Sequence, residues 1–296
     1  MPSESNEQSP RLSREPEFLR DLGVPARTCL SSRWTLVQGT KLHSRSFSRP
    51  GDAAPFVLIH GLVISSLYMI PLAECLAERH EVHALDLPGF GRGEAPAKIL
   101  SIPELADAVV GWLEQADIPR CHLVANSLGC EIAAHVAVKA PGRVASLVLI
   151  GPTLDPHAFA VTIQTLRLMR DALHEPLRLW MNWIFDFCRA GVRRALGTAR
   201  EMFRDHIENQ LPLVTAPTLI IRGGIDPTVP QRAAETMQRL LPRGGLLVLE
   251  GRPHCVHYTD PRTVCRAVEA HAGRTSAQSI MTRDQPQRTK KRIRLS

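Results

Sequence analysis

The feature that most constrains the fold is a series of short apolar runs, each separated from the next by a segment with helical spacing. The first four are PFVLIHG (55–61), HEVHALDLPG (80–89), CHLVANS (121–127) and VASLVLIGP (144–152). Apolar runs without alternation are typical of strands buried on both faces, and strands that alternate with helices form parallel sheets. Ligands of such sheets bind at the carboxyl ends of the strands, so the residues after each run are the candidates for function.

The remaining segments complete one domain with an insertion. SRWTLVQG and TKLHSRSF, joined at Gly39 and Thr40, predict an antiparallel hairpin over 32–47. From Pro152 to Pro212 the pattern is helical without an apolar strand, and strands resume at 216–224 and 244–251 before a final helix. We therefore predict an α/β fold with a mostly parallel central sheet and helices on both faces. Its core comprises 32–152 and 213–273, and a helical cap is inserted at 153–212.

Charge is concentrated at the C-terminus. The net charge of the 296 residues is +7, and 274–296 contains seven Lys or Arg and one acidic residue. The body is nearly neutral and lacks the basic bias of proteins that bind nucleic acid, so we expect no nucleic-acid partner. We expect the basic tail 274–296 to be a disordered, solvated terminus rather than a tether to an anionic membrane or nucleic acid. We also expect the polar leader 1–31 to be disordered.

Cysteine usage and hydropathy indicate the cellular setting. The seven cysteines are widely spaced and contain no CxxC pair, so neither a disulfide framework nor a zinc site is predicted. The N-terminus lacks the apolar core of a signal peptide, and no apolar run is long enough for a transmembrane segment. We expect a cytoplasmic protein with a small-molecule substrate, and a homodimer is compatible with the sequence.

Ser127 is the first candidate for chemistry, because it ends an apolar run and begins a helical pattern in HLVANSLGCEIAAH. A sharp strand-to-helix turn that presents a hydroxyl requires small residues two positions before and two positions after it. Ala125 and Gly129 meet this requirement. Taken alone, the pattern also fits a Ser that caps the N-terminus of a helix.

A Ser hydroxyl is a poor nucleophile unless a His removes its proton and a carboxylate orients that His. Asp226 follows the run TLIIRGG in a turn of Gly and Pro, which we expect to expose the carboxylate. The alternative is that Asp226 caps the helix that begins at Pro230. His254 follows the last predicted strand, from where it can reach across the strand ends to Ser127.

An oxyanion hole requires two backbone N–H groups directed at the developing negative charge. We predict that the first comes from Leu128, after the nucleophile and at a helix N-terminus, and that the second comes from Leu62, in the loop after LIHG. His60 lies in this same loop and precedes the nucleophile, so we expect it to shape the loop rather than act as the base.

The predicted cap carries an apolar stripe. Trp180, Trp183, Ile184 and Phe187 fall at i, i+3, i+4 and i+7, which is one face of a helix. The stripe can pack onto the main domain, or it can roof an apolar pocket, and both can hold for different residues. Trp180, Trp183 and Phe187 are our candidate substrate-binding residues.

Taken together, these residues resemble the α/β-hydrolase fold superfamily over about 34–272. The resemblance rests on LIHGL, DLPGFGRG, ANSLG, RGGIDPTVP and HCVHYTDP, in that order. In such enzymes the first His of an HxxHxxxP pattern is usually the base, which implies His254 here, with His257 and Pro261 at the later positions. The sequence departs from the pattern at Ala125, where Gly is usual, and at Gly93, where Ser is common.

The resemblance implies chemistry at Ser127, and it disfavours dehalogenases and epoxide hydrolases, which carry Asp at this point. We predict a serine hydrolase that cleaves a carboxylic ester or thioester of a small apolar or aromatic substrate through an acyl-enzyme. Ser127, Asp226 and His254 would be catalytic, and no metal or organic cofactor would be required. The alternatives are carbon–carbon hydrolysis of ring-fission diketones, in which the cap's Arg residues bind a carboxylate, acyl transfer, perhydrolysis, and a ligand-binding receptor.

Overall fold

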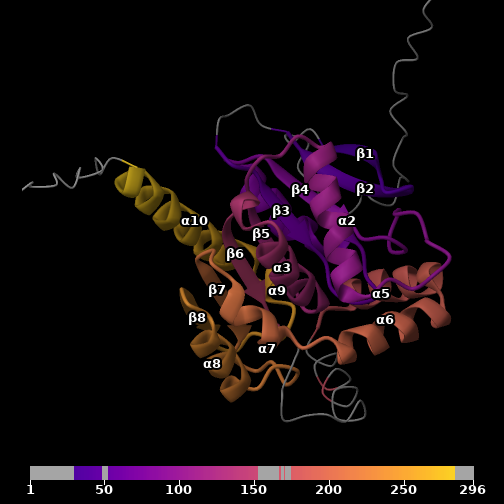
Figure 1. Ribbon diagram of the computed structural model, residues 1–296. Helices are drawn as coiled ribbons and strands as arrows, with labels where there is room; N and C mark the ends of the chain where they lie inside the picture. The colour runs from indigo at the N-terminus through magenta and orange to yellow at the C-terminus, as the bar shows by residue number, and fades with distance from the viewer. Residues whose placement is uncertain (1–29, 49–52, 153–166, 168–169, 171–174, 284–296) are drawn as a thin grey trace, which may run out of the picture.

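The computed structural model describes residues 30–48, 53–152, 167, 170 and 175–283 (Figure 1). Its centre is an eight-stranded sheet with the order β1-β2-β4-β3-β5-β6-β7-β8. All pairs from β4 to β8 are parallel, and β1 and β2 are antiparallel. The strands are β1 (Leu30–Val37), β2 (Thr40–Phe47), β3 (Phe56–Ile59), β4 (Val82–Asp86), β5 (Cys121–Asn126), β6 (Val144–Ile150), β7 (Thr218–Gly223) and β8 (Gly244–Leu249).

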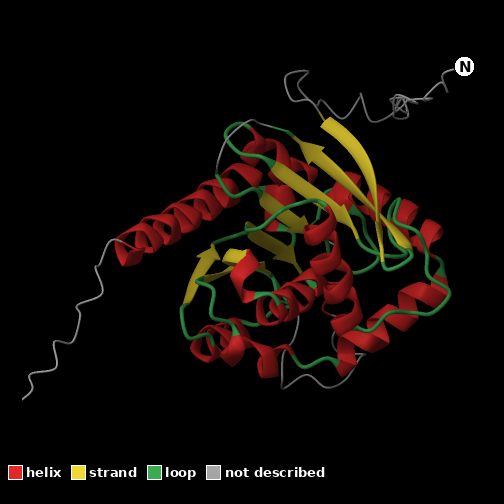
Figure 2. Ribbon diagram, turned by 45° about the horizontal axis from the view of Figure 1, so that its top comes forward, coloured by secondary structure: helices red, strands yellow, loops and turns green. Residues whose placement is uncertain are grey.

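Helices cover both faces of this sheet, which confirms the predicted fold class (Figure 1 and Figure 2). The helices α2 (Ile102–Gln115), α3 (Leu128–Lys139) and α8 (Gln231–Leu240) contribute side chains to one hydrophobic core. A second core, on the other face, contains side chains from α1 (Ile70–Ala77), α9 (Val256–Thr259) and α10 (Pro261–Arg283). Short 3₁₀ turns lie at η2 (Ser66–Met69) and η3 (Pro141–Arg143).

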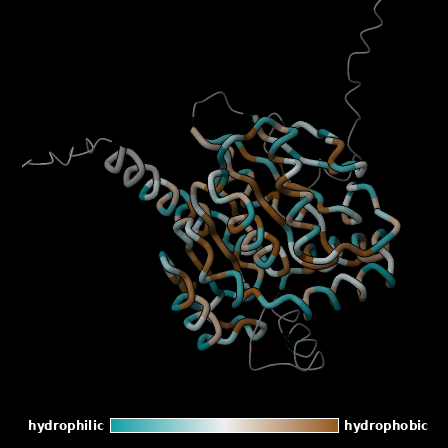
Figure 3. Tube along the Cα trace, viewed as in Figure 1, coloured by the Kyte–Doolittle hydropathy of each residue, from teal (hydrophilic) through white to brown (hydrophobic). Residues whose placement is uncertain are grey.

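The central strands show why their sequences lack alternation. In β3, Val57 and Ile59 belong to one core while Phe56 and Leu58 belong to the other. Each side of the strand therefore needs apolar side chains, as expected for a parallel sheet covered on both faces. Figure 3 shows the most hydrophobic segments gathered in the middle of the molecule.

The predicted hairpin at the start of the chain is confirmed. Strands β1 and β2 pair from Leu30 with Phe47 to Val37 with Thr40. Gln38 and Gly39 have φ of 48° and 81°, as a two-residue hairpin turn that follows the twist of the strands requires. Strand β2 then pairs antiparallel with β4, so the hairpin extends the parallel sheet at one edge.

Between β6 and β7 the described residues are largely helical, and 153–166, 168–169 and 171–174 of the expected cap lie outside them. The elements are α5 (Leu177–Ala190), α6 (Val192–Arg204), α7 (Ile207–Gln210) and η4 (Leu211–Leu213). Helix α6 lies against the loop that follows β4: Arg194 donates a hydrogen bond to the carbonyl of Pro96 at 2.6 Å, and Gly197 faces Ile99. The described part of the cap therefore contacts loops at the carboxyl end of the sheet, where the candidate site residues lie.

The chain ends differ in part from the sequence expectations. Helix α10 continues to Arg283, so ten residues that we expected in a disordered tail from 274 are helical. The apolar spacing of the final helix ends earlier, which is why sequence periodicity placed the boundary too soon. Residues 1–29 of the expected leader and 284–296 of the tail lie outside the described residues. Within the described part, we find no helix long and apolar enough to cross a membrane.

Candidate active site

Ser127 occupies a strained turn between β5 and α3. Its backbone has φ 54° and ψ −126°, a conformation that residues other than Gly rarely adopt. The Ser127 side chain makes no capping hydrogen bond to the helix, although Ser127 holds the position before its first residue. The geometry therefore disfavours the capping interpretation and fits a turn that presents the hydroxyl at the carboxyl end of the sheet.

The small residues around Ser127 are required by close backbone approaches. A Cβ added at Gly129 would lie 2.7 Å from the carbonyl oxygen of His60 and 2.8 Å from that of Ile59. A Cβ at Gly61 would lie 3.1 Å from the Cβ of Ser127. The loop after β3 thus lies directly beside the nucleophile turn. Ala125 is fully buried in β5, and its single methyl group fits there in place of the usual Gly.

The same loop holds the predicted oxyanion residue Leu62. The next residue, Val63, has φ 53°, which is rare for a β-branched residue and marks a strained turn. His60 is fully buried, its Nδ1 lies 2.8 Å from the Gly61 carbonyl, and its Nε2 accepts the backbone N–H of Leu87 at 3.1 Å. Burial also lowers the pKa of His60, which favours the neutral ring that these two bonds need. Its predicted role as a loop-shaping residue fits these contacts.

His254 and Asp226 form a buried pair. The His254 Nδ1 lies 2.8 Å from Asp226 Oδ2, and Asp226 Oδ1 accepts hydrogen bonds from the Thr228 N–H at 2.7 Å, the Thr228 hydroxyl at 2.5 Å and the Val229 N–H at 3.2 Å. Burial opposes ionisation, but the charge of His254 and these hydrogen bonds outweigh it and lower the pKa of Asp226. Asp226 is only 2% exposed, so our expectation of an exposed carboxylate is wrong: the turn encloses it.

Gly151 connects this pair to the nucleophile turn. The backbone N–H of Ser127 donates to the carbonyl of Ile150 at 3.0 Å, at the end of β6. The next residue, Gly151, has φ 56°, and a Cβ added to it would lie 2.7 Å from Cε1 and 2.8 Å from Nδ1 of His254. The imidazole therefore packs on the residue that follows the hydrogen-bond acceptor of the Ser127 N–H. The triad of Ser127, Asp226 and His254 stays a prediction.

His257, the second His of the HxxHxxxP pattern, has a different environment. It is fully buried, packs edge-on against Tyr68 with ring centroids 4.3 Å apart, and has no hydrogen-bond partner among the described residues for either nitrogen. Burial, and to a smaller extent the charge of His254, lower the pKa of His257 to about 3. Of the two candidates, His254 is the one in contact with the carboxylate.

Several positioning residues escaped the sequence interpretation. Thr228 bonds to Asp226 and lies 2.8 Å from His254 Nδ1, and Gly151 makes room for the ring. Tyr68, from the loop after β3, donates to Asn126 Oδ1 at 2.9 Å, beside the nucleophile. The local signals in the sequence were the Gly that follows the apolar run at 151 and the polar Thr in DPTVP, and neither identifies its spatial partner.

A buried polar cluster centred on Asp86 supports the loops around the site. Its carboxylate lies 2.7 Å from His43 Nδ1 and 3.2 Å from Arg45, and it accepts the backbone N–H groups of Ser66 at 2.7 Å and Arg92 at 3.0 Å. Burial opposes ionisation, but the hydrogen bond with His43 and the charge of Arg45 hold the pKa of Asp86 well below its usual range. Asp86 therefore ties the loop after β3 to the loop after β4.

The aromatic stripe of the cap is not a single buried face. Trp183 stacks on Phe187 with centroids 5.1 Å apart, and Phe187 packs against the core. Trp180 is 37% exposed and Ile184 is 53% exposed, whereas the buried residues of α5 are Leu179 and Asp186. The interpretation of packing onto the main domain therefore fits Phe187. A role of Trp180, Trp183 and Phe187 in substrate binding remains a prediction.

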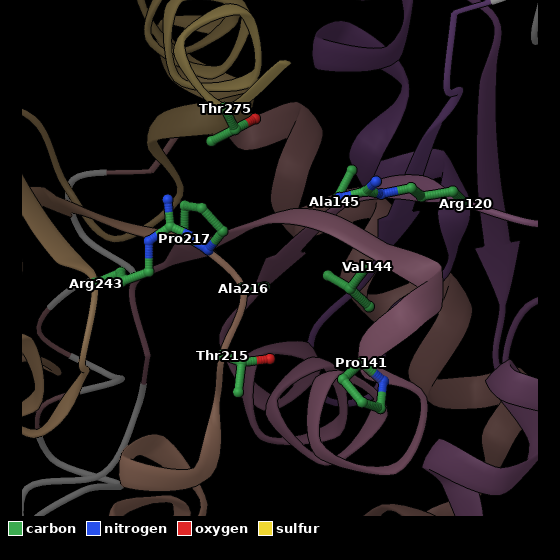
Figure 4. A pocket seen from close by; sticks show the side chains of 9 residues that line it. All are labelled: Arg120, Pro141, Val144, Ala145, Thr215, Ala216, Pro217, Arg243 and Thr275. Atoms are coloured by element: carbon green, nitrogen blue, oxygen red, sulfur yellow. The ribbon is translucent and has the colours of Figure 1, made fainter. Parts of the chain in front are cut away.

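A hollow shown in Figure 4 lies at the opposite end of the sheet. Arg120, Val144, Thr215 and Arg243 are among the side chains that line it. Val144 starts β6 while Ile150 ends it, so the length of the strand, about 20 Å, separates this hollow from Ser127. It takes no part in the site.

Within the described residues no group of three or more His, Cys, Asp or Glu could hold a metal ion.

Comparisons with known proteins agree with this fold. A family model described as alpha/beta hydrolase fold matches residues 54–187. RutD of Variovorax paradoxus, named as a carbamate hydrolase, is 30% identical over 66% of this chain and 86% of RutD. The pimeloyl-(acyl-carrier protein) methyl ester esterase of Aeromonas hydrophila is 24% identical over 78% of this chain and 100% of that protein. A thermophilic esterase from Thermogutta terrifontis, 18% identical, shares the fold with a TM-score of 0.70 over 83% of this chain and 99% of that one.

These relatives are esterases and hydrolases, and the chain is an enzyme of the hydrolase class. It belongs to the alpha/beta hydrolase fold family.

Proposed function

We propose that this enzyme is a serine hydrolase that cleaves a carboxylic ester or thioester of a small apolar or aromatic substrate. The observation that carries the proposal is the packing of His254 on Gly151, next to the strained turn at Ser127, with Asp226 on its other side at 2.8 Å. A receptor without chemistry has no need for a strained Ser beside a carboxylate-oriented imidazole.

The arrangement supports acyl transfer in two steps. Ser127 Oγ attacks the substrate carbonyl while His254 Nε2 takes its proton, and Asp226 holds the ring through Nδ1 and stabilises the imidazolium. The N–H groups of Leu62 and Leu128 donate to the oxyanion. His254 then protonates the departing alcohol or thiol, and water cleaves the acyl-enzyme by the same steps in reverse. We propose that no metal or organic cofactor takes part.

A fluorophosphonate probe, which phosphonylates activated Ser residues, tests the nucleophile. We expect stoichiometric labelling of the native chain and none of Ser127→Ala. Ser146→Ala is the matched control: Ser146 also lies close to a His, His122, at 2.8 Å, but it lies early in β6, away from the strand ends. Labelling that persists in Ser127→Ala, or that never occurs in the native chain, would contradict the proposal.

The base is tested by comparing the two neighbouring His residues. His254→Ala should abolish turnover, because the proton of Ser127 then has no acceptor. His257→Ala should retain it, because His257 bonds to neither Asp226 nor Ser127 among the described contacts. The reverse result would reassign the base.

A substrate panel divides the chemistries that share this triad. p-Nitrophenyl esters of increasing chain length, assayed beside a ring-fission dienoate, separate an esterase from a carbon–carbon hydrolase. We expect ester turnover to dominate, because Arg178, Arg189 and Arg193 of the cap are exposed to water, where a pair with a substrate carboxylate contributes little.

We also propose a cytoplasmic location. Cys75, Cys121, Cys130, Cys188 and Cys265 are free thiols in the structure, which is usual where thiols are kept reduced.

A further inference from the structure

The two long cap helices expose an unusual amount of apolar surface. Eleven large hydrophobic residues are exposed in the described part of the chain, and seven of them lie on α5 and α6. We call these seven residues the cap surface: Leu177, Trp180, Met181, Ile184, Phe185, Val192 and Leu196. Scattered single exposed hydrophobic residues need no explanation, but a concentration on two adjacent helices marks an interaction site.

The cap surface lies on the far side of α5 from the core. Leu177, Met181 and Ile184 repeat at i, i+4 and i+7, and they are 76%, 64% and 53% exposed. The residues of α5 that are buried, Leu179 and Asp186, are also seven positions apart, on the opposite side of the helix. Packing against the main domain therefore does not account for the exposed apolar side chains.

The exposed charges on these two helices are mainly positive. Arg178, Arg189, Arg193 and Arg200 are exposed around the apolar side chains. Asp186, the acidic residue of α5, is 3% exposed, and Glu201 of α6 is paired with Arg204 at 3.1 Å. The partner that complements this surface is therefore apolar and negatively charged.

We propose that the cap surface docks this enzyme onto an anionic lipid membrane. The large apolar side chains would enter the boundary between headgroups and acyl chains, while the Arg side chains reach the lipid phosphates. A second copy of the chain fits less well, because a two-fold interface would bring together two copies of the same basic surface without acidic partners. An acidic soluble protein would satisfy the Arg residues, but it would require its own exposed apolar counterpart.

The basic tail does not account for this surface. Helix α10, which leads into the tail, points away from the body at the edge opposite α5 and α6 (Figure 1). The tail can attract anionic vesicles by charge alone, so the test compares full-length chains that all retain it. Docking also does not depend on catalysis, and Ser127→Ala should bind vesicles as the native chain does.

Vesicle flotation provides the test, with phosphatidylglycerol mixed into phosphatidylcholine. We expect the native chain to float with these vesicles. The double variant Met181→Glu/Phe185→Glu should bind about tenfold more weakly, because it loses two exposed apolar side chains that would enter the membrane. The matched control is Leu36→Glu/Leu213→Glu, which places the same charges at leucines that are 60% and 58% exposed elsewhere on the chain. This control should bind as the native chain does.

Circular dichroism confirms that each variant is folded, and fluorophosphonate labelling confirms it again for the variants that retain Ser127, so a loss of binding cannot be a loss of structure. Equal flotation of the cap variant and the native chain, or no flotation of either, would overturn the proposal. A native dimer in sedimentation equilibrium that becomes monomeric in Met181→Glu/Phe185→Glu, without vesicle binding, would assign the cap surface to a second copy. Equal binding to pure phosphatidylcholine would contradict the role of the Arg residues.

Discussion

The carboxyl edge of the sheet and helix α5 of the cap both contain buried carboxyl groups, but the pKa of these groups is shifted in opposite directions. At the sheet edge, Asp226 and Asp86 each accept several hydrogen bonds, and both have a lowered pKa. On α5, Asp186 is 3% exposed, and its Oδ2 has no hydrogen-bond partner among the described residues. Burial first, and then the charge of Asp86, raise the pKa of Asp186 to about 6, against the opposing influence of Ser65 and Arg45.

This difference separates carboxylates with fixed hydrogen-bond donors at the sheet edge from a carboxyl on α5 that is incompletely satisfied. Charges at the sheet edge are held by fixed donors, so the triad needs little rearrangement when the reaction begins. The α5 helix instead contributes an incompletely satisfied carboxyl at its contact with the main domain and apolar side chains on its outer surface. Changes at the sheet edge should therefore affect catalysis most, and changes in α5 should mainly affect stability and docking.

The largest effect on catalysis is expected from Asp226→Asn, which keeps the shape of the side chain but removes its charge. The His254 ring would lose the acceptor that sets its tautomer, and kcat should fall by about 10⁴-fold with a small change in KM. Asp205→Asn is the matched control, because Asp205 pairs with His135 at the same distance, 2.8 Å, away from the triad. A similar loss in both variants would show that Asp226 acts through general stability rather than through His254.

A smaller effect is expected from Gly151→Ala. The added Cβ would lie 2.7 Å from His254 Cε1, so the ring must shift, and a displacement of that size should lower kcat about 10²-fold. Gly251→Ala separates this clash from backbone strain, because Gly251 also has a positive φ of 67° but nothing lies within 4 Å of its Cβ position. If the two variants lose equal activity, Gly151 serves the backbone rather than the position of the imidazole.

The sequence predicted those parts of the fold that depend on local pattern and chain order. Apolar runs without alternation identified the buried strands, and because carboxyl ends of parallel strands share one edge, Ser127, Asp226 and His254 could be grouped before any contact was known. The hairpin could also be predicted from local pattern, because Gly39 marks the turn between two strand-like runs.

Other parts depend on which distant segments meet, and no local pattern records that. Asp86 meets His43 and Arg45 only because β2 pairs antiparallel with β4. The apolar stripe of α5 was likewise ambiguous, because helical periodicity groups residues on a face but does not say which face meets the core when both are apolar. The burial of Leu179 and Asp186 settles this orientation for α5.

The smallest effect is expected from Asp186→Asn, which tests α5 most directly and should change the free energy of unfolding. The folded pKa of about 6 lies above the ordinary value of 3.8, so the folded protein holds a proton that the unfolded chain releases between these values. Stability should therefore fall as pH rises from 3.8 to about 6 and stay lower above it, by a cost on the order of 2 to 3 kcal/mol.

Asn carries no charge and escapes that cost, although it forfeits part of the interaction with Ser65. In urea unfolding at about pH 7.5 we expect Asp186→Asn to be more stable than the native chain by roughly 1 to 2 kcal/mol, with a smaller gain at about pH 4.5. The lowered pKa values of Asp226 and Asp86 give the opposite dependence, because the stability they contribute is lost as pH falls below 3.8. Both carboxylates are present in the two chains, so their contribution cancels in the difference. A loss of stability at the higher pH would show that Asp186 is stabilised as the ion, and an equal gain at both pH values would show that its ionisation carries no cost. Either result would contradict the contrast between the sheet edge and α5.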